Sequence, residues 1–143
     1  PIKSSAASDG YKRQPKEVIR LLNERKNQIY AVRGNCEAEV DQMVLDFPVM
    51  ADYCILAIEG KTMYATHGHI YNKDNLPPMM DGDILIHGHT HVLKAENMGN
   101  YILLNPGSVS IPKEGNPPTY AILENGIFTI KDFEGNTVRE ITL

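Results

Sequence analysis

The five histidines of this 143-residue chain all fall between positions 67 and 91, and this clustering constrains the fold more than any other feature. They occupy two short loops, His67-Gly68-His69 and His87-Gly88-His89-Thr90-His91, and each loop follows an apolar run that is typical of a strand. A third predicted strand ends in Gly34-Asn35. Because sites in sheet-based α/β proteins gather at the carboxyl ends of strands, the sequence predicts that these three loops lie close together.

Periodicity along the chain predicts a mixed α/β protein that becomes β-rich toward its carboxyl end. Helical patterns run from Pro15 to Arg25 or Lys26 and over Glu37–Phe47, where Pro48 ends the second pattern. Strands are predicted over residues 28–33, 53–58, 61–66, 83–86, 92–98, 101–104, 120–123, 127–131 and 137–143. The length and the lack of repeats or linkers predict a single domain over residues 1–143.

Composition argues against several classes of partner. The formal net charge is −4, and the basic residues between positions 12 and 26 alternate with Glu17 and Glu24, which is typical of a solvated helix face rather than a nucleic-acid site. No apolar run approaches the roughly 20 residues that cross a bilayer, and residues 1–9 do not resemble a signal peptide. We therefore expect no membrane partner. Cys36 and Cys54 make no disulfide framework, so we expect a cytoplasmic protein.

The histidine spacing indicates a divalent metal site. His89 and His91 stand two apart, and in an extended segment both would lie on one side of the chain, within reach of one metal or of two neighbouring metals. The lack of C-x-x-C pairing argues against a structural zinc site. In the alternative interpretation the histidines are loop or cap residues bonded to the backbone. His87 precedes the glycine and is expected to face away from His89.

Three motifs resemble, in order and approximate spacing, those of the calcineurin-like metallophosphoesterases: Gly34-Asn35-Cys36-Glu37, Thr66-His67-Gly68-His69 and Gly88-His89-Thr90-His91. The loop Asn105-Pro106-Gly107-Ser108 further resembles the small bacterial and archaeal phosphodiesterases of the YfcE type, and the resemblance covers the chain from about Pro15 onward. It implies a four-layer α-β-β-α sandwich that hydrolyses a phosphodiester with a water activated between two metal ions.

The resemblance also implies a role for individual residues. Asn35, His67 and His89 resemble the ligands of one metal, and His91 resembles a ligand of the other. The two ions would be Mn²⁺ first, with Ni, Zn or Fe as alternatives. Cys36 stands where many relatives have a histidine that donates a proton to the leaving oxygen, and His69 is the other candidate for this catalytic role.

Two of the family's five motifs have no counterpart in this sequence: an aspartate-x-histidine and a glycine-aspartate whose carboxylate bridges the metals. The N-terminal β-α-β portion of the domain is therefore expected to be absent from the chain, and metal-dependent hydrolysis by this chain is expected to be impaired. An uncovered sheet edge would favour a homo-oligomer. Two alternatives are a non-catalytic protein-binding scaffold of the same fold, resembling a retromer subunit, and a structural fragment stabilised by oligomer contacts.

Overall fold

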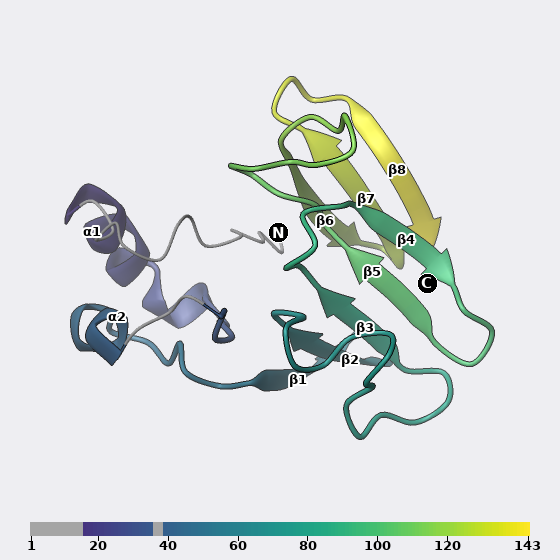
Figure 1. Ribbon diagram of the computed structural model, residues 1–143, viewed down its shortest axis with the longest axis horizontal. Helices are drawn as coiled ribbons and strands as arrows, with labels where there is room; N and C mark the ends of the chain where they lie inside the picture. Colours follow the sequence, from purple (N-terminus) through teal and green to yellow (C-terminus); the bar gives the residue numbers. More distant parts are fainter. Residues whose placement is uncertain (1–15, 36–38) are drawn as a thin grey trace.

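The computed structural model describes residues 16–35 and 39–143, which form two sheets and a separate helical region (Figure 1). The helical elements are α1 (Lys16–Glu24), the 3-10 helix η1 (Lys26–Gln28) and α2 (Glu39–Val44). The strands are β1 (Tyr53–Ile58), β2 (Lys61–Thr66), β3 (Ile84–His87), β4 (Lys94–Asn97), β5 (Ile102–Asn105), β6 (Thr119–Glu124), β7 (Ile127–Asp132) and β8 (Thr137–Thr142). Each strand predicted after residue 50 is confirmed to within two residues at both ends.

The first sheet has the strand order β1-β2-β3-β5-β4, and the second has the order β6-β7-β8. Strands β2, β3 and β5 run parallel to one another, whereas β1 and β4 are antiparallel strands at the two edges. Thr66 at the end of β2 pairs with His87 at the end of β3. This register places the loops that follow the two strands at the same edge of the sheet, as the sequence predicts.

The two sheets enclose the main apolar core. Alternate side chains of the strands point into the space between the sheets, and Met63, Phe128 and Ile130 there are fully buried. Burial of each such side chain stabilises the fold by about 1.5–3 kcal/mol. Strands β4 and β8 lie side by side and close one flank of this sandwich (Figure 1).

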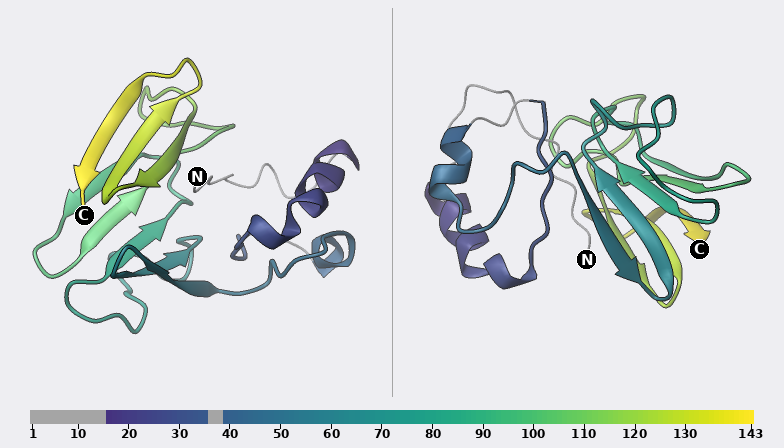
Figure 2. Two further views of the ribbon diagram at one scale, coloured as in Figure 1. Left: turned by 180° about the vertical axis from the view of Figure 1, so that it is seen from behind. Right: turned by 90° about the horizontal axis from the view of Figure 1, so that it is seen from below.

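The helical region lies beside the sandwich and does not cover either sheet (Figures 1 and 2). Leu45, Phe47 and Val49 form its small core, which Ile19 and Leu22 of α1 help to enclose. On the opposite face of α1, Arg20 forms ion pairs with Glu17 and Glu24, and all three side chains are exposed. The predicted solvated helix face is therefore confirmed for α1.

The strand predicted over residues 28–33 is wrong. Lys26–Gln28 form η1, and the chain then runs through residues 29–34 without strand pairing. Ile29 has extended backbone angles, and the amide of Arg33 donates to the carbonyl of Ala51 at 2.8 Å. A β-rich segment becomes a strand only when a neighbouring strand pairs with it, and no described strand lies beside this one.

The second helix is shorter than the pattern over Glu37–Phe47 predicts. It ends at Val44, and residues 36–38 at its predicted start lie outside the described residues. The side chain of Gln42 donates to the carbonyl of Phe47 at 3.0 Å and accepts from the amide of Val49 at 2.9 Å. These bonds satisfy backbone groups beyond the end of α2, and Pro48 disfavours helical geometry in the residue before it.

No helix in the two described stretches is both long enough and apolar enough to cross a lipid bilayer.

Candidate metal centre

Three predicted ligands converge on one point. His67 Nε2 lies 2.9 Å from Asn35 Oδ1 and 3.2 Å from His89 Nδ1. Two ligand atoms on the same ion, each at about 2.0–2.2 Å, lie roughly 3 Å apart, so this spacing suits a shared metal. Asn35 contributes an amide oxygen, so the trio contains only two imidazoles. Among the His, Cys, Asp and Glu side chains of the described residues, no group of three is arranged to hold an ion.

His91 and His69 flank this trio. His91 Nδ1–H donates to the carbonyl of Ile111 at 2.8 Å, which leaves Nε2 as the free nitrogen. A bond of this kind sets the tautomer and the ring orientation of a metal-binding histidine. The ring of His69 lies 5.3 Å from that of His67 and 6.2 Å from that of His89, between centroids. Its Nδ1 is buried without a hydrogen-bond partner in the part of the chain that the structure describes.

His87 takes no part in the trio. Its side chain is buried, and its Nδ1–H donates to the neighbouring carbonyl of Gly88 at 3.0 Å. The prediction that His87 faces away from His89 agrees with this bond. For His87 the backbone-bonded interpretation holds.

The segment from His89 to His91 is not extended, and the expectation that extension places both rings on one side is wrong. Both residues have left-handed backbone, with φ of 64° and 61°. The amide of Thr90 donates to the carbonyl of Gly88 at 2.7 Å, which folds the loop back on itself. Left-handed geometry costs a residue with a Cβ about 1–2 kcal/mol, and such strain is concentrated at functional sites.

Close contact between the two histidine loops requires glycine at position 68. A Cβ on Gly68 would lie 2.8 Å from His87 Nδ1 and 3.1 Å from His89 Cβ, and its φ is +116°. The amide of Gly88 donates to the carbonyl of His67 at 2.9 Å. The backbones of the loops are therefore in direct contact, which brings His67 and His89 together.

Sequence reasoning missed the part that Ile111 plays at this site. Its carbonyl holds His91, and its own amide donates to Ser108 Oγ at 2.9 Å. Every residue type carries a backbone carbonyl, so the sequence gives no signal for this contact. Arg33 directly precedes the Gly34-Asn35 loop, and its guanidinium pairs with the carboxylate of Asp52 at 2.9 Å. Cys36 lies outside the described residues.

Two of the proposed ligands, His67 and His89, are held in their neutral form. The pKa of His67 is lowered to about 4, mainly by burial and then by repulsion from the other imidazoles, His89 first. Burial is also the main reason why the pKa values of His87 and His89 are lowered. Neutral imidazole is the form that binds a metal, so His67 and His89 are available as ligands at pH 7.

We expect the metal-free protein to lose stability as the pH falls from about 6.5 toward 4. The pKa of His67 is about 4 in the folded chain against 6.5 normally, so in this window only the unfolded chain takes up the proton. Above the window neither state is protonated and the stability is complete. The loss should be on the order of 1–2 kcal/mol, because the ring is partly screened by solvent.

Urea unfolding in the presence of a chelator, at several pH values, measures this effect. A His67→Asn variant cannot take up the proton and should lose stability less steeply over the same window. An identical pH dependence in the variant and the parent would contradict the prediction.

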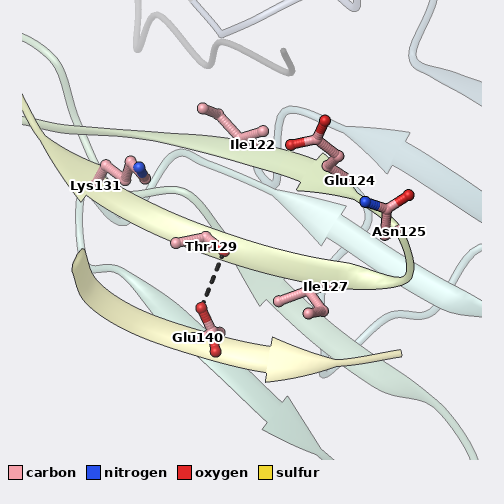
Figure 3. A pocket seen from close by; sticks show the side chains of 7 residues that line it. All are labelled: Ile122, Glu124, Asn125, Ile127, Thr129, Lys131 and Glu140. Carbon is pink, nitrogen blue, oxygen red and sulfur yellow. Dashed lines mark hydrogen bonds between the residues drawn. The ribbon is translucent and has the colours of Figure 1, made fainter. Parts of the chain in front are cut away.

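A shallow hollow lies away from the histidines, on the outer face of the three-stranded sheet (Figure 3). It has a volume of about 240 Å³ and carries charges of both signs, with Lys131, Glu124 and Glu140 among the residues that line it. Thr129 Oγ1 donates to Glu140 at 3.3 Å across it. It holds no histidine or cysteine, so the candidate site remains at the histidine loops.

The calcineurin-like phosphoesterase superfamily domain matches residues 7–126 of the sequence. The chain belongs to this superfamily. It is 44% identical over 126 residues to phosphodiesterase YfcE of Escherichia coli K12, an alignment that covers 88% of this chain and 67% of the relative. It is 26% identical over 121 residues to the probable metallophosphoesterase YsnB of Bacillus subtilis, covering 77% of this chain and 67% of the relative.

Solved structures of relatives confirm the fold class of this phosphoesterase domain. The structure of YfcE, a phosphoesterase from E. coli, matches with a TM-score of 0.84 and 40% identity over 88% of this chain and 70% of that one. Vps29 of Entamoeba histolytica matches with a TM-score of 0.51 and 19% identity over 97% of this chain and 96% of that one. The likeness to Vps29 concerns the fold alone. Membership of the phosphoesterase superfamily therefore favours the phosphoesterase interpretation over the protein-binding scaffold.

Proposed function

We propose that this phosphoesterase domain hydrolyses phosphodiesters with the help of two divalent metal ions. The observation that carries the proposal is the convergence of two ligand atoms on His67 Nε2, with Asn35 Oδ1 at 2.9 Å and His89 Nδ1 at 3.2 Å from it. The name of the E. coli relative, phosphodiesterase YfcE, supports a diester as the substrate class.

Asn35, His67 and His89 would hold one ion, and the free Nε2 of His91 would contribute to the second. When bound, a pair of divalent ions activates water as a nucleophile and offsets charge on the phosphoryl oxygens. The chain itself orients the ligands: the bond to Ile111 sets the tautomer of His91, and burial keeps His67 neutral. Manganese is the proposed metal, although imidazole and amide ligands also accept Ni, Zn and Fe.

His69 is the proposed proton donor to the leaving oxygen. It lies in the same loop as His67, and its buried Nδ1 has no hydrogen-bond partner among residues 16–35 and 39–143. Cys36 is the alternative donor from the sequence. Arg33 is a weaker candidate for a substrate contact, because its guanidinium already pairs with the carboxylate of Asp52.

The four proposed ligands are one amide and three imidazoles, and none of them carries a negative charge. Without an anionic ligand little offsets the cost of stripping water from a divalent ion, so ions held by these four residues alone would bind weakly. We expect weak Mn²⁺ binding and low hydrolytic activity for the 143-residue chain by itself.

Metal content and metal removal test the proposal together. Any hydrolysis of bis(p-nitrophenyl) phosphate by the purified chain should require Mn²⁺, disappear on chelation and return when Mn²⁺ is added back. Calorimetry with Mn²⁺ should show less than two tightly bound equivalents per chain. Two tight equivalents would contradict the expected weakness, and hydrolysis that survives complete metal removal would contradict the metal mechanism.

Self-association through β1 forms part of the proposal. This strand lies at an edge of the first sheet, and 55% of the surface of Ile55 is exposed on it. Exposed edge strands pair with further strands unless charge or covering blocks them. Light scattering should detect a dimer or larger species, and Ile55→Lys should shift it toward the monomer. A monodisperse monomer at high concentration would contradict self-association.

A cytoplasmic setting is also proposed. Cys54 is a free, half-buried thiol, and burial raises its pKa. A thiol of this kind is stable in a reducing compartment.

A further inference from the structure

The buried side chain of Asn105, at the end of β5, is bonded to the loop that carries His89 and His91. Its Nδ2 donates to the carbonyl of Gly88 at 3.1 Å and to Thr90 Oγ1 at 3.0 Å. Its Oδ1 accepts from the amide of Gly107 at 2.9 Å. Asn105 is 2% exposed, so these bonds lie in a region with little access for competing water.

The two bonds from Nδ2 bracket a strained backbone. Gly88 and Thr90 lie on either side of His89, which has a φ of 64°. Left-handed geometry of a histidine persists only where the surroundings enforce it. The amide of Asn105 connects the residues before and after His89 to the rigid end of β5, and so opposes relaxation of the loop.

A second set of bonds connects the same region to His91. The loop after Asn105 passes through the fully buried Ser108, whose Oγ accepts from the amide of Ile111 at 2.9 Å. The carbonyl of Ile111 accepts from His91 Nδ1 at 2.8 Å. The amide of Lys113 donates to the carbonyl of His91 at 3.2 Å. Residues 105–113 therefore support both histidines from one side.

We infer that Asn105 is a positioning residue for the candidate metal ligands: its amide holds residues 88–90 in the conformation that directs His89 and His91 into the site. The inference rests on the proposed function for the identity of the ligands. Asn105 is not itself a proposed ligand. It acts through Gly88 and Thr90, the neighbours of His89 in the chain. Loss of such supporting contacts lowers metal affinity by about 10–100-fold.

Two measurements on the full chain test this role. Calorimetry with Mn²⁺ alone should show that Asn105→Ala weakens binding by about 10–100-fold. In the metal-free protein, strong intraresidue amide–Hα NOEs of His89 and His91 report positive φ, and Asn105→Ala should lose them. Asn105→Asp keeps the acceptor for Gly107 but, when ionised, cannot donate, so it should behave like Asn105→Ala.

The chain provides a matched control at the opposite end of the same hairpin. Asn97 Oδ1 accepts from the amide of Gly99 at 2.9 Å, the same two-residue bond that Asn105 makes to Gly107. Asn97→Ala should leave Mn²⁺ binding and both NOEs unchanged. Should the Asn105 variants fail to fold, Thr90→Val removes one acceptor from the exposed side of the loop and should weaken binding in the same direction.

The outcomes separate this inference from the proposed function. Unchanged Mn²⁺ affinity and retained NOEs in Asn105→Ala would overturn the positioning role, even if the variant melts at a lower temperature. Unchanged Mn²⁺ affinity in Thr90→Val would do the same if only that variant folds. No Mn²⁺ binding by the parent chain would contradict the proposed ligands, and the NOEs would then decide the role of Asn105 alone.

Discussion

Replacing His89 by alanine should weaken Mn²⁺ binding by at least about 100-fold and lower phosphodiester hydrolysis by roughly 1,000-fold, or about 4 kcal/mol in the barrier. Its Nδ1 lies 3.2 Å from His67 Nε2, so the substitution removes one of three converging ligand atoms. Calorimetry with Mn²⁺ and hydrolysis of bis(p-nitrophenyl) phosphate measure the two effects. His89→Asn tolerates the left-handed backbone at this position better than alanine does, and separates loss of the ligand from relaxation of the loop.

His87→Gln is the matched histidine control. His87 is the last residue of β3, two residues before His89, but it bonds to the carbonyl of Gly88 and takes no part in the converging trio. Its replacement should lower stability and leave the Mn²⁺ stoichiometry unchanged. Equal loss of Mn²⁺ binding in His87→Gln and His89→Ala would count against the proposed ligand set, because a general loosening of the loops would then explain both.

Replacing Gly107 by alanine should destabilise the fold by about 3 kcal/mol or more, equivalent to a fall of roughly 10 °C in Tm. The added Cβ would lie 2.1 Å from Thr119 Oγ1 and 3.3 Å from Leu93 Cβ, and the φ of +85° disfavours any side chain. Thr119 is buried, and its hydroxyl donates to the carbonyl of Pro106 at 2.7 Å, so it has little freedom to move away. Urea unfolding with a constant m-value measures the change.

Gly135→Ala separates backbone strain from steric overlap. Its φ is +92°, close to that of Gly107, but a Cβ there would have no heavy atom within 4 Å. It should cost only about 1 kcal/mol. The double variant Gly107→Ala/Thr119→Ala should lose less stability than the sum of its two single changes, because Thr119→Ala removes the closest contact of the new Cβ. Similar losses for Gly107→Ala and Gly135→Ala would show that packing against Thr119 contributes little.

Local pattern was sufficient to predict the strands after residue 50 and the two loops that carry the histidines. Alternation in runs such as 61–66 and 127–131 follows from side chains that point to opposite faces, and the structure keeps those strands to within two residues. The approach of His67 to His89 follows from loops at the ends of β2 and β3, whereas Asn35 reaches them from a segment that forms no strand. Motif resemblance then supplied the family, which the match over residues 7–126 confirms.

Pairing and backbone geometry depended on tertiary structure. Residues 29–34 have β-forming side chains, yet strand formation requires a neighbouring strand, which no local pattern supplies. The same holds for the left-handed backbone of His89 and His91, because sequence favours negative φ for histidine and only the contacts of the folded chain outweigh that preference.

The amino-acid sequence by itself determined which residue types stand at the ends of the strands, because hydrophobic alternation and the positions of glycines are patterns that span only a few neighbouring residues. Only the tertiary structure decided how those side chains are held: His91 by the carbonyl of Ile111, the loop of His89 by the amide of Asn105, and His67 in its neutral form by burial. Hydrogen bonds between residues 15 or more positions apart, and the removal of water around an imidazole, exist only once the chain has folded.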